Sequence, residues 1–199
     1  MRLANVQFAQ NEGTLCGVTV HVGGIVLAAG AGTRFGMPKV LAAEGHWLAN
    51  AVTALREGGC DDVVVVLGAA IVDVPPPARA VTAPDWAEGM SASLRAGMSA
   101  LEAADYAVVL TVDTPDIGAE AVRRVLDTAQ RSQSGIARAR YGVRPGHPVV
   151  IARRHWPEVF TTLSGDEGAR AFLNSRGDVA DVECEDLSTG ADIDVNPQP

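Results

Sequence analysis

A glycine-rich stretch with two basic residues carries the clearest chemical signal in this 199-residue sequence. Residues 27–39 read LAAGAGTRFGMPK and continue an apolar run at residues 24–29, which predicts a buried strand that ends in a loop. Glycines allow backbone N–H groups to approach an anion closely, and Arg34 and Lys39 add two positive charges. Ligands of open α/β sheets bind beyond the carboxyl ends of strands. The stretch therefore predicts a phosphate-binding loop.

The spacing within this loop separates three kinds of phosphate site. A P-loop requires Ser or Thr directly after its lysine, and Val40 stands there instead. A dinucleotide fingerprint can be drawn through the glycines, but Pro38 interrupts the helix that should follow. Two cations suit a nucleoside triphosphate, which has more charge than a dinucleotide. The alternative without chemistry is a tight turn whose Arg34 and Lys39 face solvent.

Asp113 is the candidate metal ligand. It follows the apolar residues 106–112, which predict another central strand, so its carboxylate is expected to face the same cleft as the loop. Magnesium prefers oxygen ligands and often takes one or two carboxylates together with phosphates and waters. The alternative is an Asp that only starts a turn, with Asp116 capping the next helix.

The remaining elements alternate between strand-like and helix-like patterns. Strands are predicted at residues 24–29, 62–68, 81–82, 106–112, 136–139 and 149–151, and helices at 47–57, 91–103, 119–131, 156–163 and 168–173. This order predicts a single α/β domain over residues 23–199, a Rossmann-like three-layer sandwich with a mostly parallel sheet and helices on both faces. Residues 146–148 are expected in a tight loop between the last two strands. Residues 1–22 are assigned to a leader, either a loose extension or an extra strand around residues 18–22.

Composition narrows the class of protein. The net charge of -8 argues against a nucleic-acid partner. No apolar run approaches the roughly 20 residues of a membrane span, and the first residues lack a signal-peptide pattern. Three widely spaced cysteines (Cys16, Cys60 and Cys184) indicate reduced thiols. We therefore expect a cytoplasmic protein.

The loop resembles the LAAGxGxRxGxxK signature of nucleotidyltransferases with a GT-A-type, Rossmann-like fold. Three further segments, residues 84–97 (PDWAEGMSASLRAG), 146–149 (GHPV) and 164–170 (SGDEGAR), resemble the molybdenum cofactor cytidylyltransferases, relatives of the molybdopterin guanylyltransferases. The similarity runs over residues 24–194. Two places depart from the family pattern: Val112 replaces the usual glycine before the aspartate, and residues 40–46 differ from the usual sequence after the lysine.

The resemblance implies a role for each matching residue. Asp113 would bind Mg²⁺, with Asp194 in the segment DID as a second ligand or, alternatively, part of a solvated tail. Arg34, Lys39 and Asp113 would be catalytic. The residues implied to contact the nucleotide are Leu27, Ala28, Ala29, Gly30, Ala31, Gly32, Thr33, Arg34, Lys39, Gly89, Met90 and Ser93.

The resemblance also implies acceptor contacts at His147, Asp166 and Arg170. For three of the matching segments a simpler interpretation stands beside the functional one. A histidine in a tight loop, as expected at His147, is more often structural than catalytic. Ser91 would cap an ordinary helix that starts near residue 91. Asp166 would lie at a helix N-terminus, where the helix dipole favours acids.

The implied reaction transfers a nucleotidyl group, with CMP from CTP favoured, to a phosphate monoester of a pterin-type acceptor and releases pyrophosphate. A molybdoenzyme or its maturation chaperone would receive the product. The alternatives are a sugar- or polyol-phosphate nucleotidyltransferase, a non-catalytic carrier of a nucleotide or matured cofactor, and a Rossmann dehydrogenase.

Overall fold

Strands with apolar residues on both faces form the centre of a seven-stranded sheet. The structure, a computed structural model, describes residues 19–195. The strands are β1 (Val22–Leu27), β2 (Asp62–Leu67), β3 (Arg79–Thr82), β4 (Tyr106–Thr111), β5 (Ile136–Tyr141), β6 (Arg144–Ala152) and β7 (Ala180–Glu183). Their order across the sheet is β3-β2-β1-β4-β6-β5-β7. Only β6 runs antiparallel to its neighbours, so the predicted mostly parallel sheet is confirmed.

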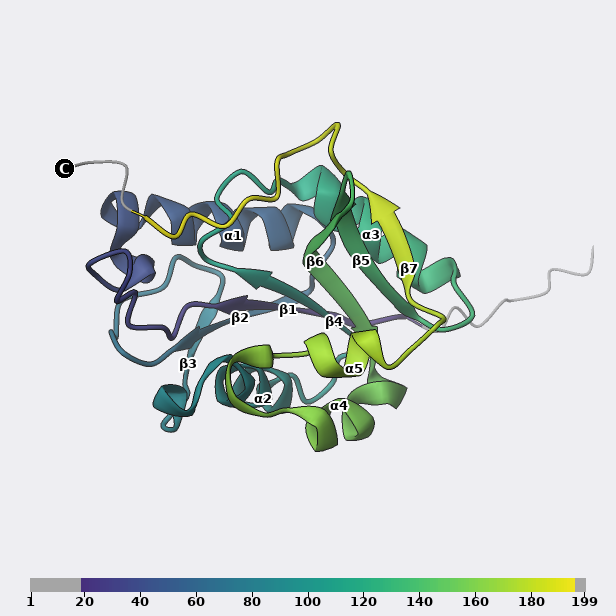
Figure 1. Cartoon of the computed structure of the whole chain (residues 1–199), viewed down its shortest axis with the longest axis horizontal. Helices are drawn as coiled ribbons and strands as arrows, with labels where there is room; N and C mark the ends of the chain where they lie inside the picture. The colour runs from purple at the N-terminus through teal and green to yellow at the C-terminus, as the bar shows by residue number, and fades with distance from the viewer. Residues whose placement is uncertain (1–18, 196–199) are drawn as a thin grey trace, which may run out of the picture.

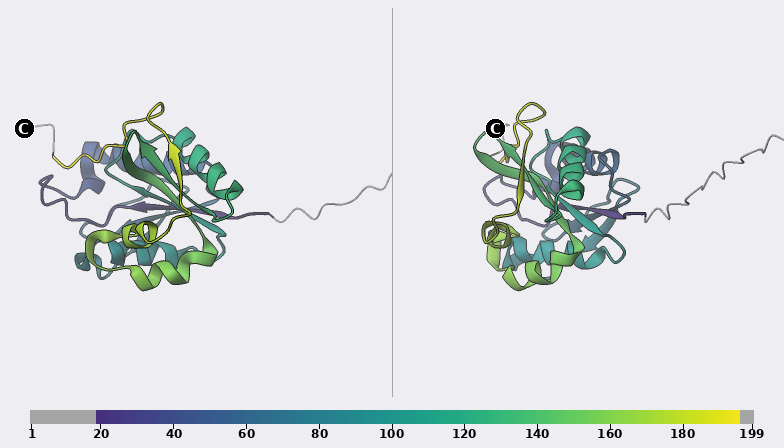
Figure 2. Two further views of the ribbon diagram at one scale, coloured as in Figure 1. Left: turned by 45° about the vertical axis from the view of Figure 1, so that its right-hand side comes forward. Right: turned by 90° about the vertical axis from the view of Figure 1, so that its right-hand side faces the viewer.

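Helices cover both faces of this sheet, as predicted (Figure 1). They are α1 (His46–Glu57), α2 (Met90–Ala100), α3 (Ala119–Arg131), α4 (Trp156–Thr162) and α5 (Arg170–Asn174). Short 3-10 turns are η1 (Lys39–Gly45), η2 (Trp86–Glu88), η3 (Arg153–His155) and η4 (Gly165–Glu167). Helices α1 and α3 lie on one face, and α2, α4 and α5 lie on the other (Figure 2). None of these helices is long and apolar enough to cross a membrane.

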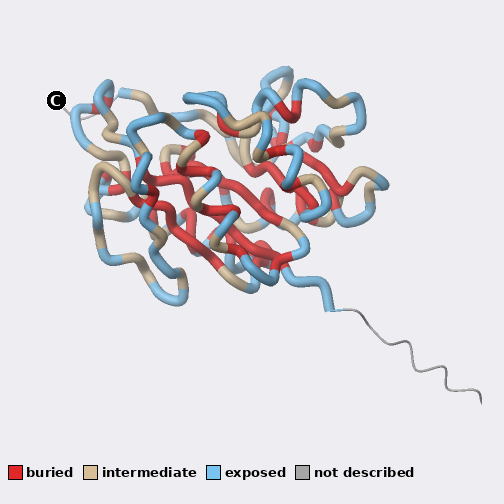
Figure 3. Tube along the Cα trace, turned by 90° about the horizontal axis from the view of Figure 1, so that it is seen from below, coloured by how far each residue is buried: buried red, intermediate tan, exposed pale blue. Residues whose placement is uncertain are grey.

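Alternate side chains of the central strands divide the core between the two faces. In β2, Val63 and Val65 pack toward α1 and α3, whereas Val64 and Val66 pack toward α2. All four are at most 1% exposed. The sheet is therefore buried on both sides, which explains why these strands are apolar at every position. Figure 3 shows this as buried strands inside an exposed outer layer.

The prediction of a loop at residues 146–148 is wrong. These residues belong to β6, and the β5–β6 hairpin turns earlier, at residues 142–143, where Gly142 has a φ of 61°. The pairing of β5 with β6 is irregular between Arg138 and Arg140. Proline is tolerated in a strand at such an irregularity, because the missing N–H interrupts no regular ladder there. The prolines around His147 therefore mark an irregular strand.

Two further differences concern the chain ends. Strand β7 was not predicted, because only Val182 of its four residues is buried. Val22, which was assigned to the leader, is the first residue of β1. Residues 1–18, with Cys16 and most of that leader, lie outside the described residues.

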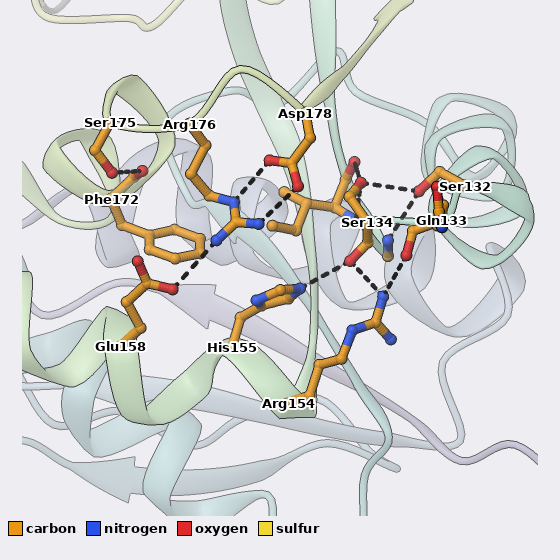
Figure 4. A network of polar contacts seen from close by, with 12 residues as sticks. Ser132, Gln133, Ser134, Arg154, His155, Glu158, Phe172, Ser175, Arg176 and Asp178 are labelled. Atoms are coloured by element: carbon orange, nitrogen blue, oxygen red, sulfur yellow. Dashed lines mark hydrogen bonds and ion pairs between the residues drawn. The ribbon is translucent and has the colours of Figure 1, made fainter.

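A polar network stabilises the end of the sheet that lies opposite the glycine-rich loop (Figure 4). Arg154 Nη2 donates a hydrogen bond to the carbonyl oxygen of Gln133 at 2.8 Å, and His155 Nε2 lies 2.8 Å from the carbonyl oxygen of Ser134. Arg176 bridges Asp178 and Glu158, at 2.7 and 3.2 Å. These contacts join the α3–β5 turn to η3, and the α5–β7 connection to α4, at the amino ends of β5 and β7. They therefore stabilise the fold at this end of the sheet.

Gly97 permits the close approach of α2 to the sheet. A Cβ at this position would lie 2.7 Å from Ile25 Cγ2 and 2.9 Å from Val66 Cγ2, two stiff β-branched side chains. We expect Gly97→Ala to lower the free energy of unfolding by about 1–3 kcal/mol through overpacking, although alanine is the better helix former. Urea denaturation measures this change.

Gly177→Ala is the matched control, because a Cβ there meets no atom within 4 Å. Its free energy of unfolding is expected to stay within about 0.5 kcal/mol of the parent. A Gly97→Ala protein as stable as the parent would mean that α2 can move away from the sheet without cost.

Candidate active site

The glycine-rich loop follows β1, its first residues are hydrogen-bonded to the end of β2, and its backbone folds back at Gly32. The N–H of Ala28 donates to Val66 O at 3.0 Å, and Ala29 O accepts from Ala69 N at 2.9 Å, so β2 holds the start of the loop. Gly32 has a φ of 61°, and a Cβ there would lie 1.9 Å from Met37 O. Only glycine fits this position, because of both its φ and the close backbone approach. The sequence therefore dictates the fold of the loop locally.

An aromatic contact anchors the middle of the loop. The ring of Phe35 is buried and lies 5.4 Å from the ring of Trp47 in α1, tilted by 57°. Next to it, the side chain of Arg34 is 78% exposed and that of Lys39 only 15%. The loop thus holds one basic residue that is largely covered and one that is exposed.

Lys39 joins two acids that are far apart in the sequence. Its Nζ donates to Asp113 Oδ2 at 2.8 Å and to Asp194 Oδ1 at 2.9 Å. Arg34 Nη1 lies 3.1 Å from Asp194 Oδ2. All three residues predicted to be catalytic, and both predicted metal ligands, therefore meet in one cluster. Of the two simpler alternatives, the solvent-facing turn holds for Arg34 and not for Lys39, and the tail at Asp194 is paired with both basic residues.

The charges in this cluster stabilise one another. Burial lowers the pKa of the Lys39 ammonium, but the hydrogen bonds and charges of Asp113 and Asp194 outweigh it, so the pKa lies above its ordinary value. The hydrogen bond from Lys39, together with the charge of Arg34, lowers the pKa of the Asp194 carboxyl. Lys39 is therefore an ammonium and Asp194 a carboxylate at neutral pH.

The C-terminal tail reaches the site through backbone contacts. Ile193 N donates to Asp113 O at 3.0 Å, and Asp116 Oδ2 accepts from Thr189 N at 2.7 Å and Thr189 Oγ1 at 2.6 Å. The interpretation of Asp116 as a helix cap is wrong: Gly118 precedes α3 and no side chain caps it. Asp116 instead holds the tail, so that Asp194 reaches Lys39.

The acid pair has the chemistry of a magnesium site. Asp113 Oδ1 is buried and lacks a hydrogen-bond partner within residues 19–195, and Asp113 Oδ2 and Asp194 Oδ1 already share one cation. Over the same residues, His, Cys, Asp and Glu side chains form no group of three or more that would hold a metal. Magnesium, which commonly takes few protein ligands, fits two carboxylates.

Three further residues predicted to contact the nucleotide lie at the start of α2. Gly89, with a φ of 113°, is the residue before the helix, and Met90 is half exposed. Ser93 is only 5% exposed. The interpretation of Ser91 as the helix cap is wrong, because its Oγ makes no hydrogen bond with any described residue.

His147 lies on β6 beside the acid cluster. Its Nδ1 is 3.2 Å from Val109 O in β4. Burial lowers the pKa of His147, against the opposing effects of this hydrogen bond and of the charges of Asp192 and Asp113. At neutral pH the imidazole is therefore uncharged. Asp192, which sequence reasoning passed over, belongs to the same surroundings: burial and the charge of Asp113 raise its pKa.

The other two predicted acceptor contacts differ in their surroundings. Asp166 Oδ1 accepts from Met90 N at 3.3 Å, so this acid sits at a helix N-terminus, but the helix is α2 and not the one that follows it. Arg170 begins α5 and is exposed. Neither residue contacts the Lys39 cluster through a hydrogen bond or ion pair.

Comparison with known proteins shows which proteins this chain is similar to. A family model described as a MobA-like NTP transferase domain matches residues 24–180. A protein of Paenarthrobacter nicotinovorans named nicotine blue oxidoreductase is 38% identical over 193 residues, which cover 89% of this chain and 94% of that protein.

Solved structures show the same fold. Rv0371c from Mycobacterium tuberculosis H37Rv is 26% identical, with a TM-score of 0.69 over 82% of this chain and 88% of that one. A complex of Rv0371c with manganese superposes with a TM-score of 0.63 at 24% identity, over 82% of this chain and 88% of that one. The second match supports the fold alone.

Lys39 carries a testable electrostatic prediction. Replacing it by Met leaves Asp113 and Asp194 without their shared cation, so we expect the free energy of unfolding at low ionic strength to fall by about 1–2 kcal/mol. Mg²⁺ or Mn²⁺ at millimolar concentration should restore more stability to Lys39→Met than it adds to the parent, because the divalent ion replaces the ammonium. Urea denaturation with and without the metal measures both effects.

Arg34→Met serves as the control, because Arg34 pairs with the same Asp194 but is largely exposed. Its loss of stability should stay below about 0.5 kcal/mol. If Lys39→Met unfolded at the parent's urea concentration and responded to metal no more than the parent, the cluster would have no electrostatic role.

Proposed function

Since the chain belongs to the MobA-like NTP transferase family, we propose that it transfers a nucleotidyl group from a nucleoside triphosphate to a phosphate monoester. The favoured reaction takes CMP from CTP and uses molybdopterin or the molybdenum cofactor as acceptor. A molybdoenzyme or its maturation chaperone receives the product, in the cytoplasm. The single observation that carries the proposal is the cluster in which Lys39 links Asp113 to Asp194, next to Arg34.

In the proposed step, an oxygen of the acceptor phosphate attacks the α-phosphorus of the triphosphate. A new P–O bond forms, the bond from the α-phosphorus to the bridging oxygen breaks, and pyrophosphate leaves with the electron pair. The acceptor phosphate is already an anion at neutral pH, so no general base is needed. The protein has to hold two anions together and stabilise charge on the leaving group.

The residues of the cluster supply this stabilisation. Lys39 and Arg34 provide positive charge at the loop, and Gly30 leaves open space, because a Cβ there would meet no atom within 4 Å. Asp113 and Asp194 would hold Mg²⁺, which neutralises phosphate charge when it is bound. Gly89, Met90 and Ser93 form the proposed wall for the base, and His147 and Arg170 are proposed acceptor contacts.

A second candidate function follows from the relative that is 38% identical, nicotine blue oxidoreductase. An oxidoreductase on this scaffold would bind the pyrophosphate of a nicotinamide dinucleotide at the glycine-rich loop and pass hydride to a heteroaromatic acceptor. Hydride transfer assigns no role to the acid pair Asp113 and Asp194, which is why the transferase is favoured.

Asp113, the acid after β4, has a testable role in the proposed reaction. Asp113→Asn keeps the size of the side chain but removes the charge, so we expect pyrophosphate release to fall about 100-fold. Asp127→Asn is the control, because Asp127 is paired with Arg131 on α3, outside the cluster. An Asp113→Asn protein with the parent's rate would contradict the role proposed for this acid.

An assay of both reactions separates the transferase from the oxidoreductase. The parent protein is offered CTP, GTP and UTP in turn with Mg²⁺ and each acceptor class, and pyrophosphate is followed. In parallel it is offered NADH and NADPH with nicotine blue, and absorbance of the reduced cofactor is followed. We expect pyrophosphate release with CTP and no cofactor oxidation; the reverse pattern would replace the transferase by the oxidoreductase.

A further inference from the structure

Helix α2 begins without a cap from its own sequence. Gly89 precedes the helix and has no side chain, and the hydroxyl of Ser91 is buried without a hydrogen-bond partner among residues 19–195. The first helical N–H group, that of Met90, instead meets the carboxylate of Asp166, 76 residues further along the chain. Unpaired N–H groups at a helix start require such a partner. A separate segment of the chain therefore completes the start of α2.

The turn at residues 164–168 fits tightly against this helix start. A Cβ at Gly89 would lie 2.5 Å from Gly165 C and 2.6 Å from Asp166 Oδ1, and a Cβ at Gly168 would lie 3.1 Å from Met90 Sδ. Gly89 and Gly168 also have φ values of 113° and 53°. The two backbones thus approach closely at Gly89, the Met90 side chain packs on Gly168, and at both positions only glycine is free of strain. Figure 1 shows the connection from α4 to α5, which contains this turn, running beside α2.

The same helix start is connected to the glycine-rich loop. Trp86 of η2 packs on Gly68, where a Cβ would lie 2.5 Å from Trp86 Cγ and 2.8 Å from Ala29 O. Ala29 O also accepts the N–H of Ala69. A continuous set of contacts therefore runs from the turn at residues 164–168, through residues 86–90, to the first residues of the loop.

Open space, rather than packed side chains, borders the other side of this junction. A cavity of about 550 Å³ is lined by residues of both segments, among them Asp85, Ser91 and Gly165. No apolar core therefore supports the helix start from this side. The hydrogen bond from Met90 to Asp166 and the glycine contacts hold it in place.

From these contacts we propose that Asp166 is a positioning residue: it sets the place of Gly89 and Met90, and so shapes the nucleotide wall without touching the acceptor. The proposal rests on the proposed function, in which these two residues face the nucleotide. It differs from the acceptor contact that the family resemblance implies for Asp166. Removal of the carboxylate frees the Met90 N–H group and loosens the start of α2.

The experiment compares Asp166→Ala with Asp166→Asn and with Glu167→Ala. Glu167 is the matched control, because it is the adjacent acid of η4 and its side chain makes no hydrogen bond or ion pair with the described residues. Asp166→Ala should raise the KM and the dissociation constant for CTP about three- to tenfold, as expected for the loss of a cap, and leave kcat within about twofold. Asn also caps helices, so Asp166→Asn should recover most of the affinity.

Amide hydrogen exchange of residues 89–94 gives a readout that needs no activity. We expect faster exchange there in Asp166→Ala, and no change in Glu167→Ala. The proposal is overturned if Asp166→Ala matches Glu167→Ala in both exchange and CTP affinity. It is equally overturned if kcat falls while KM for CTP stays constant, because Asp166 would then act on the acceptor.

The two proposals fail in different ways. Absence of pyrophosphate release from the parent protein, with every acceptor, removes the transferase reaction. In that case the dissociation constant for CTP replaces KM as the measure of positioning. A parent that releases pyrophosphate while Asp166→Ala behaves as the parent removes only the role of Asp166.

Discussion

The ammonium of Lys39, shared by two carboxylates, is the interaction on which the arrangement of the site depends. Asp113 reaches it from the end of β4 and Asp194 from the C-terminal tail, where Ile193 N also donates to Asp113 O. The side chain of Lys39 is only 15% exposed, and two carboxylates that meet at such a position repel each other unless a cation lies between them. The glycine-rich loop, the central sheet and the tail are therefore joined at one charged group. Phosphates that enter the cleft meet a site in which cations and acids are already in place.

Much of this arrangement could be predicted from local sequence. The central strands were found because β2 and β4 are apolar at nearly every position, a pattern that only a doubly covered sheet explains. The loop was found because Arg34, Lys39 and the glycines stand close together in the chain. Asp113 was found because an acid directly after a buried strand points to the carboxyl edge of the sheet.

The features that escaped prediction all depend on contacts between distant segments. Nothing near Asp166 indicates that its carboxylate meets Met90, and nothing near Asp116 indicates that it holds Thr189. Strand β7 is recognisable only once β5 is in place as a partner, because a single buried valine provides no pattern. The prolines beside His147 suggested a loop, since their tolerance in β6 depends on an irregular pairing with β5. Sequence spacing fixes local geometry, whereas these contacts need the fold.

The relation between the loop and the acids also bears on how one scaffold hosts relatives named for different reactions. A triphosphate and a dinucleotide both present phosphates to a glycine-rich loop, so the roles proposed for Gly32, Arg34 and the backbone N–H groups fit either ligand. The acid pair, Asp113 and Asp194, has a proposed role in only one of the two reactions. Hydride transfer moves no phosphorus and leaves no pyrophosphate behind, so it gains nothing from two carboxylates that converge on a cation. In this chain Asp116 and the backbone of Ile193 hold the tail so that Asp194 joins Asp113. In the proposed reaction, these two acids serve group transfer at phosphorus.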